Sequence, residues 1–115
     1  MKKLEFSPLV RNKLRRLKLH LLSEYGDTTA IKILRGIIED AEKLMMFDEI
    51  GTDISKLYDL DTEYWYLFTH QHYLIFRREK KKVIIVQIFH EREDFMMKLF
   101  GISGRTQESI DYWGD

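Results

Sequence analysis

The chain has 115 residues, enough for one domain, and its hydrophobic (44%) and charged (33%) fractions are typical of a globular protein. It contains no cysteine, so disulfides and thiolate metal sites are excluded. The first eight residues lack the apolar core of a signal peptide, and the most apolar run, residues 83–89, is far too short to cross a bilayer. These features predict a cytoplasmic protein without a membrane segment.

The formal net charge is zero, but acidic and basic residues are unevenly distributed along the chain. Residues 1–26 carry seven Lys or Arg against two acids, whereas residues 27–63 carry four against ten. Such segregation can give a neutral molecule one basic and one acidic surface, although solvated helix faces explain it equally well. A protein that holds nucleic acid through phosphates alone would normally have a basic excess, and this chain has none.

The first half of the chain has the apolar spacing of one strand and two helices. Residues 3–6 are a strand candidate. Ser7 and Pro8 suit the N-cap and first position of a helix, and Gly26 suits its end. A second amphipathic helix follows, with its N-cap among residues 27–29. The short connection predicts that the two helices form an antiparallel hairpin.

The second half predicts three strands, at residues 63–69, 72–78 and 83–89, because these runs are rich in aromatic or β-branched residues. Gln71 and the cluster at residues 79–82 suit the two hairpin turns between them. The last run is apolar on both faces, so we expect it to be an interior strand.

Asp94 predicts the N-cap of a short helix, and the polar stretch from Gly51 to Asp61 is expected to be irregular. The element order is β-α-α-β-β-β, which indicates an α+β fold with a helical hairpin packed on one face of an antiparallel sheet. The other face would then be free as a working surface. The predicted core consists of Leu14, Leu17, Leu34, Ile38, Ile84 and Val86.

Three stretches, occurring in order, resemble the RelE/ParE toxin superfamily. They are residues 51–57 (GTDISKL), residues 72–78 (HYLIFRR) and residues 83–94, which end in a His-x-Arg-x-Asp pattern. The resemblance covers residues 1–101, predicted as the toxin domain, and leaves residues 102–115 as a polar C-terminal tail. It implies a type II toxin–antitoxin (plasmid stabilisation) toxin that inhibits growth and is neutralised by a cognate antitoxin in a hetero-oligomer.

The resemblance implies two different activities. ParE-like members poison DNA gyrase by binding, whereas RelE-like members are metal-independent endoribonucleases that cut mRNA on the ribosome. The His-x-Arg-x-Asp pattern after the last strand and the absence of a basic excess favour the gyrase poison. An inactive relative is a third possibility. At the third-strand motif, His72 stands where ribonuclease members often have arginine, and Arg77 stands where many relatives have tyrosine.

Candidate residues of the toxin-active surface are His90, Arg92 and Arg78. A ribonuclease needs a base, an acid and a cation for the phosphate. His90 could be the base or the acid, Glu91 or Glu93 the other, and Arg78 or Arg92 the cation. Each also has a structural explanation: His90 shares a predicted strand face with apolar residues at positions 84, 86 and 88, and the arginines can pair with neighbouring acids.

Antitoxin binding is expected on the basic first helix, at Arg11, Arg15 and Lys18. No cofactor is expected. His70 and His72, which flank the turn at Gln71, are expected to face each other across the hairpin, but without an acidic partner they make a poor metal site, so none is predicted.

Overall fold

The structure is a computed structural model that describes residues 1–101, and the predicted tail at residues 102–115 lies outside the described residues. Within it the elements follow in the order β1 (Lys3–Phe6), α1 (Pro8–Tyr25), α2 (Asp27–Lys43), the short 3-10 helix η1 (Asp48–Ile50), β2 (Thr52–Asp53), α3 (Ile54–Tyr58), β3 (Tyr64–Thr69), β4 (His72–Arg78), β5 (Lys82–His90) and α4 (Phe95–Phe100). The predicted α+β fold is confirmed.

The strands form one five-stranded sheet in the order β1-β5-β4-β3-β2. β1 lies parallel to β5, and the remaining pairs are antiparallel. The prediction that β5 is an interior strand is confirmed, since β1 and β4 flank it. The expectation of an irregular stretch from Gly51 to Asp61 is wrong, because β2 pairs with β3 and α3 follows it. Strands of two residues are too short to leave a periodic signal in the sequence.

The helical hairpin begins as predicted, because the Val10 amide donates to Ser7 Oγ over 3.2 Å and Pro8 occupies the first helical position. Gly26, with φ of +82°, ends α1. It is also the N-cap residue of α2, whose first turn has no side-chain cap. The predicted cap at residues 27–29 is therefore wrong. Positive φ costs glycine little, so one residue can end the first helix and precede the next.

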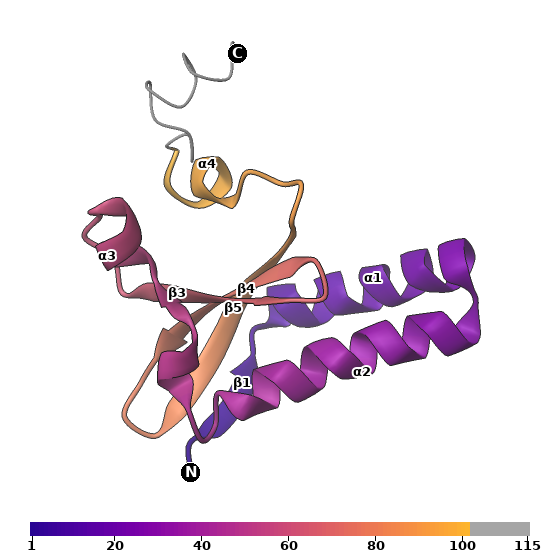
Figure 1. Cartoon of the computed structure of the whole chain (residues 1–115), viewed down its shortest axis with the longest axis horizontal. Helices are drawn as coiled ribbons and strands as arrows, with labels where there is room; N and C mark the ends of the chain where they lie inside the picture. The colour runs from indigo at the N-terminus through magenta and orange to yellow at the C-terminus, as the bar shows by residue number, and fades with distance from the viewer. Residues whose placement is uncertain (102–115) are drawn as a thin grey trace.

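The hairpin of α1 and α2 packs on one face of the sheet (Figure 1). Leu14 and Leu17 pack against this core as predicted, but on α2 the fully buried side chains are Ala30, Ile37 and Ala41. Leu34 and Ile38 are only partly buried and belong to neither apolar cluster of the described residues, so their assignment to the core is wrong. Apolar side chains surround much of this helix, and only its docking angle on the sheet selects the buried stripe.

The opposite face of the sheet is not free. The short helices α3 and α4 lie against it (Figure 1) and form a second core with Ile54, Ile75, Phe89, Phe95 and Met96. The expected open working surface on this face is therefore wrong. The predicted helix after Asp94 is confirmed, because Asp94 Oδ1 accepts a hydrogen bond from the Met97 amide over 3.1 Å. None of the helices within residues 1–101 combines the length and hydrophobicity that a membrane crossing requires.

A register shift in β5 changes the face on which its last residues lie. Ile75 of β4 pairs with Gln87, whereas the next residue, Phe76, pairs with Ile85, so Val86 has no partner on β4. Such a bulge reverses the alternation of side chains beyond it. Ile88 consequently packs with the hairpin-side core and Val86 with the opposite one. The predicted face shared by His90 with positions 84 and 86 is therefore wrong.

Candidate functional site

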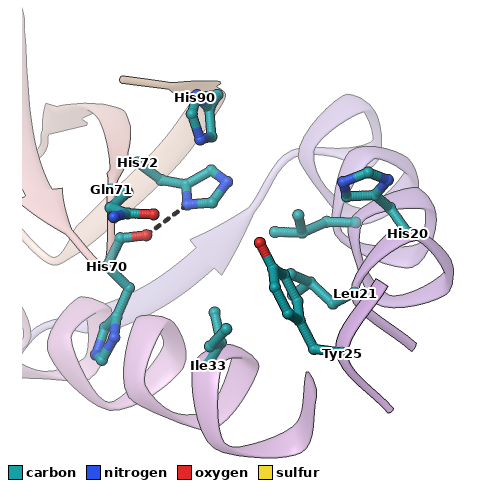
Figure 2. Close-up of a pocket in the computed structure, with 9 residues that line it drawn as sticks. His20, Leu21, Tyr25, Ile33, His70, Gln71, His72 and His90 are labelled. Atoms are coloured by element: carbon teal, nitrogen blue, oxygen red, sulfur yellow. Dashed lines mark hydrogen bonds between the residues drawn. The ribbon is translucent and has the colours of Figure 1, made fainter. Parts of the chain in front are cut away.

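The hairpin side of the sheet carries a groove where the end of β5 and the β3–β4 turn approach α1. One cavity there, of about 390 Å³, is lined by Leu17, His20, Leu21, Tyr25, Ile33, His70, Gln71, His72 and His90 (Figure 2). A second, also about 390 Å³, is lined by Lys13, Arg16, Leu17, His20, His72, Ile88, His90 and Glu93. We call the two together the histidine groove, because all four histidines of the chain line it.

His72 and His90 are the central polar residues of the histidine groove. They are directly paired across β4 and β5, with ring centroids 5.2 Å apart and ring planes at 90°. His72 Nδ1 lies 2.8 Å from the His70 carbonyl oxygen, which can only accept, so this nitrogen carries the proton. Burial lowers the pKa of His72, and His90 acts in the same direction, although the His70 carbonyl opposes the shift. His72 is therefore neutral at pH 7, with a free lone pair on Nε2.

His90 has the opposite tautomer. The Arg92 amide donates to His90 Nδ1 over 3.1 Å, so that nitrogen is the acceptor and Nε2 carries the proton of the neutral ring. The turn after β5 is held on both sides: the Glu93 amide donates to the His90 carbonyl over 2.9 Å, and the Glu91 amide donates to the Gln71 carbonyl over 2.8 Å. His90 is thus fixed by the exit segment that the sequence singled out.

Lys13, Arg16 and His20 form one row along α1, and we call it the groove row. Lys13 Nζ donates to Gln87 Oε1 over 2.6 Å and lies 4.6 Å from the centre of the Phe89 ring. Burial lowers the pKa of Lys13, against the opposing effect of Glu93. Glu93 itself accepts a hydrogen bond from Lys98 Nζ over 2.8 Å. The rim of the groove therefore carries cations on α1 and one engaged carboxylate.

The turn between β3 and β4 consists of His70 and Gln71, with φ of +46° and +65°. His70 is thus a turn residue, and its ring lies against Gly36 of α2, where an added Cβ would approach Nε2 to 2.2 Å. The expectation that His70 and His72 face each other is wrong, because Thr69 pairs with His72. Within residues 1–101 no three His, Asp or Glu side chains are arranged to hold a metal ion.

Arg78 lies at the far end of β4, about 20 Å from the groove at the usual rise of about 3.3 Å per residue. Its Nη2 donates to Asp48 Oδ1 over 3.1 Å, and its guanidinium lies 4.3 Å from the centre of the Trp65 ring. Lys2 binds the other oxygen of Asp48. Burial opposes ionisation of Asp48, but these two hydrogen bonds outweigh it and lower its pKa. The structure therefore separates Arg78 from His90 and gives it structural partners.

The remaining predicted residues are exposed on the surface. Arg92 follows His90 in the exit turn, so these two candidates are neighbours. Arg11, Arg15 and Lys18 are exposed on α1. At 3.6 residues per turn, they form a second basic row on a different flank of the helix from the groove row.

Sequence reasoning missed the groove row and the role of His72. The spacing of Lys13, Arg16 and His20, at i, i+3 and i+7, was a readable signal of one helix flank. The pairing of His72 with His90 was not readable, because it depends on the bulge at Val86.

The fold and its surfaces define a small α+β domain with two basic helix flanks and a fixed polar groove. The family model described as "ParE toxin of type II toxin-antitoxin system, parDE" matches residues 4–95, and the chain therefore belongs to the ParE toxin family. The structure is similar to a chain from the "Chromosomal ParDE TA system from P. aeruginosa", with a TM-score of 0.65 and 18% sequence identity. That match covers 78% of this chain and 96% of the other. The comparison with curated proteins gives no significant match.

Proposed function

We propose that this ParE-family toxin acts in the cytoplasm as a poison of DNA gyrase, without chemistry of its own, and that a cognate antitoxin neutralises it in a hetero-oligomer. The observation that carries the proposal is that Arg78 does not converge with His90 and Arg92. Arg78 is engaged by Asp48 at the other end of β4, so it is not available as a phosphate clamp beside His90.

The state of His90 also favours binding over acid–base chemistry. A general acid at this position would have to carry protons on both ring nitrogens. Protonation of Nδ1 would place two donors against each other, because the Arg92 amide already donates to this atom. The exit turn therefore uses His90 Nδ1 as a hydrogen-bond acceptor.

The alternative, an mRNA endoribonuclease, has one observation in its favour. His72, which has a free lone pair on Nε2, and the cation of Arg16 line the same groove as His90. This set offers a base and a phosphate ligand, but no good acid for the leaving 5′ oxygen.

The two activities differ in their response to substitution of the exit segment. We expect Arg92→Ala to weaken growth arrest, because the exposed cation belongs to the toxin-active surface. His90→Gln should be tolerated by a gyrase poison, whereas it should cost a ribonuclease on the order of 10²–10⁴ in rate. Arg78→Lys, which keeps a cation near Asp48, is the matched control and should leave the activity unchanged.

The measurement is growth arrest after induction, followed together with a DNA-damage reporter, transcript integrity and cleavage of plasmid DNA by purified gyrase. Circular dichroism checks that each variant folds. DNA damage and trapped gyrase cleavage complexes would support the proposal. Rapid mRNA cleavage without DNA damage, abolished by His90→Gln, would overturn it in favour of the ribonuclease.

The antitoxin is proposed to contact Arg11, Arg15 and Lys18, the exposed basic row of α1. Contacts to such a row should steer an acidic segment onto the helix and should weaken as the salt concentration rises. Reversing all three charges should reduce the affinity for the protein encoded next to the toxin gene. Unchanged affinity and unchanged salt dependence would contradict this assignment.

A further inference from the structure

The histidine groove contains two polar atoms whose roles are fixed by the backbone. Because His72 Nδ1 donates to the His70 carbonyl, its Nε2 can only accept in the neutral ring. Because His90 Nδ1 accepts from the Arg92 amide, its Nε2 can only donate. Neither Nε2 atom has a hydrogen-bond partner within residues 1–101. The pair of His72 and His90 therefore presents one acceptor and one donor to the groove.

The rings that carry the acceptor and the donor lie side by side. The two residues are direct cross-strand partners, and their rings are 5.2 Å apart at 90°. Figure 2 shows both rings at the β-strand side of the cavity, while the ring of His70 points away toward α2. An adjacent acceptor and donor match a group that donates and accepts at neighbouring atoms. In polypeptides this group is the side-chain amide of Asn or Gln, because the N–H and C=O of a trans peptide bond point in opposite directions.

The surroundings of the pair describe the rest of the ligand. Leu17, Leu21 and Ile33 give the cavity an apolar wall, and Tyr25 points its hydroxyl into the cavity (Figure 2). Arg16 adds a cation, whereas the carboxylate of Glu93 is already bound by Lys98. A ligand that fits this groove combines an apolar side chain, an amide and a negative charge, which is the chemistry of a polypeptide segment.

We propose that the histidine groove is a second antitoxin anchor, which takes an acidic segment of the cognate antitoxin by binding one of its Asn or Gln side-chain amides between His72 Nε2 and His90 Nε2–H. The inference rests on the proposed function, because it takes the antitoxin as the partner. It adds a polar, orientation-specific site to the salt-dependent contact at Arg11, Arg15 and Lys18. The amide fixes the register of the segment, while charge attraction guides its approach.

The test uses the full chain and its cognate antitoxin. Long-range ¹⁵N NMR of the imidazoles reads the tautomers directly. In the free toxin we expect the proton of His72 on Nδ1 and that of His90 on Nε2. On binding, His72 Nε2 should shift as it accepts a hydrogen bond, and the His90 Nε2 proton should become protected from exchange. Unshifted signals in a saturated complex would overturn the proposal, whatever the variants do.

In a second experiment, calorimetry measures the affinity of toxin variants for the antitoxin. His90→Leu, which keeps bulk but removes the donor, should weaken binding roughly tenfold, as expected for one lost hydrogen bond in a desolvated site. Lys56→Gln is the matched control, because it also removes a donor but this exposed side chain belongs to α3, on the opposite face of the sheet. It should leave the affinity within about twofold.

The outcomes separate this inference from the proposed function. If the wild-type toxin binds no antitoxin, the proposed function fails. If the antitoxin binds and the imidazole signals do not move, only the groove assignment fails. Inorganic phosphate is tested as a separate probe. If phosphate shifts the two imidazoles and the antitoxin does not, the groove is an anion site and the proposal is overturned.

Discussion

The two ends of β4 carry ionisable side chains on the same side of the sheet. At one end, the closed end, their polar groups are engaged within the fold; at the other, the open end, each ring keeps one nitrogen free. At the closed end Arg78 is engaged by the buried carboxylate of Asp48 and by the Trp65 ring, and Lys2 completes the cluster. At the open end His72 and His90 each use one nitrogen to bind the backbone and turn the other toward an open groove. Residues whose polar groups are fully used by the fold stabilise it. Residues with one group held and one free keep a polar atom available in the groove.

The largest effect is expected at the closed end. Asp48→Ala leaves Lys2 and Arg78 without their shared carboxylate, so the free energy of unfolding should fall by about 2–3 kcal/mol. The matched change at the open end, Glu93→Ala, removes a more exposed ion pair with Lys98 and should cost about 1 kcal/mol or less. Urea denaturation measures both variants, and equal losses would contradict the difference between the two ends.

The cap of α4 comes next in size. Asp94→Ala removes the acceptor for the Met97 amide and should cost about 1 kcal/mol, because the N-terminal amide loses its partner. Asp94→Asn keeps an acceptor oxygen at the same place and should restore most of that stability. Thermal unfolding distinguishes the two variants. If asparagine is as harmful as alanine, the loss does not come from the cap.

The open end should also give the protein a pH dependence near neutrality. Burial lowers the pKa of His72, so below about pH 6.5, the ordinary histidine value, the unfolded chain binds more protons than the folded one. The free energy of unfolding should therefore decrease as the pH falls from 6.5 toward the lower folded pKa.

Two controls isolate this histidine. His72→Gln should reduce the slope of stability against pH between pH 5 and 7. The lowered pKa of Asp48 acts in a different window, because its contribution is lost only as the pH falls below about 4. An unchanged slope in the glutamine variant, followed by urea titration at several pH values, would show that His72 does not contribute.

The smallest effect is expected at a surface pair outside both clusters. Lys82 Nζ lies 3.3 Å from Glu5 Oε1 across β1 and β5, and both side chains are well exposed. Glu5→Gln should change the free energy of unfolding by no more than about 0.5 kcal/mol, because solvent screens the pair. A loss as large as that of Asp48→Ala would show that exposure does not separate structural from incidental ion pairs in this fold.

Local chemistry in the sequence was sufficient for much of the fold. The Ser7 cap with Pro8, the glycine at position 26 and the Asp94 cap each satisfy or release backbone groups within a few residues, so they could be recognised without tertiary information. Strands β3, β4 and β5 were found within one residue at each end, because aromatic and β-branched residues leave a strong signal.

The tertiary structure alone decided the site. Val86 has no partner on β4 because of the way β4 and β5 align. This bulge places His90 on the hairpin side of the sheet. Arg78 became structural because the chain folds back to bring Asp48 beside it, 30 residues away in sequence. The tautomers of His72 and His90 depend on carbonyl and amide groups that only the hairpin and the exit turn place.

Sequence by itself determined the elements, their caps and the family resemblance, because these depend on neighbours along the chain. Which side chains are free to bind depends on contacts between strands and helices, and only the folded molecule fixes them.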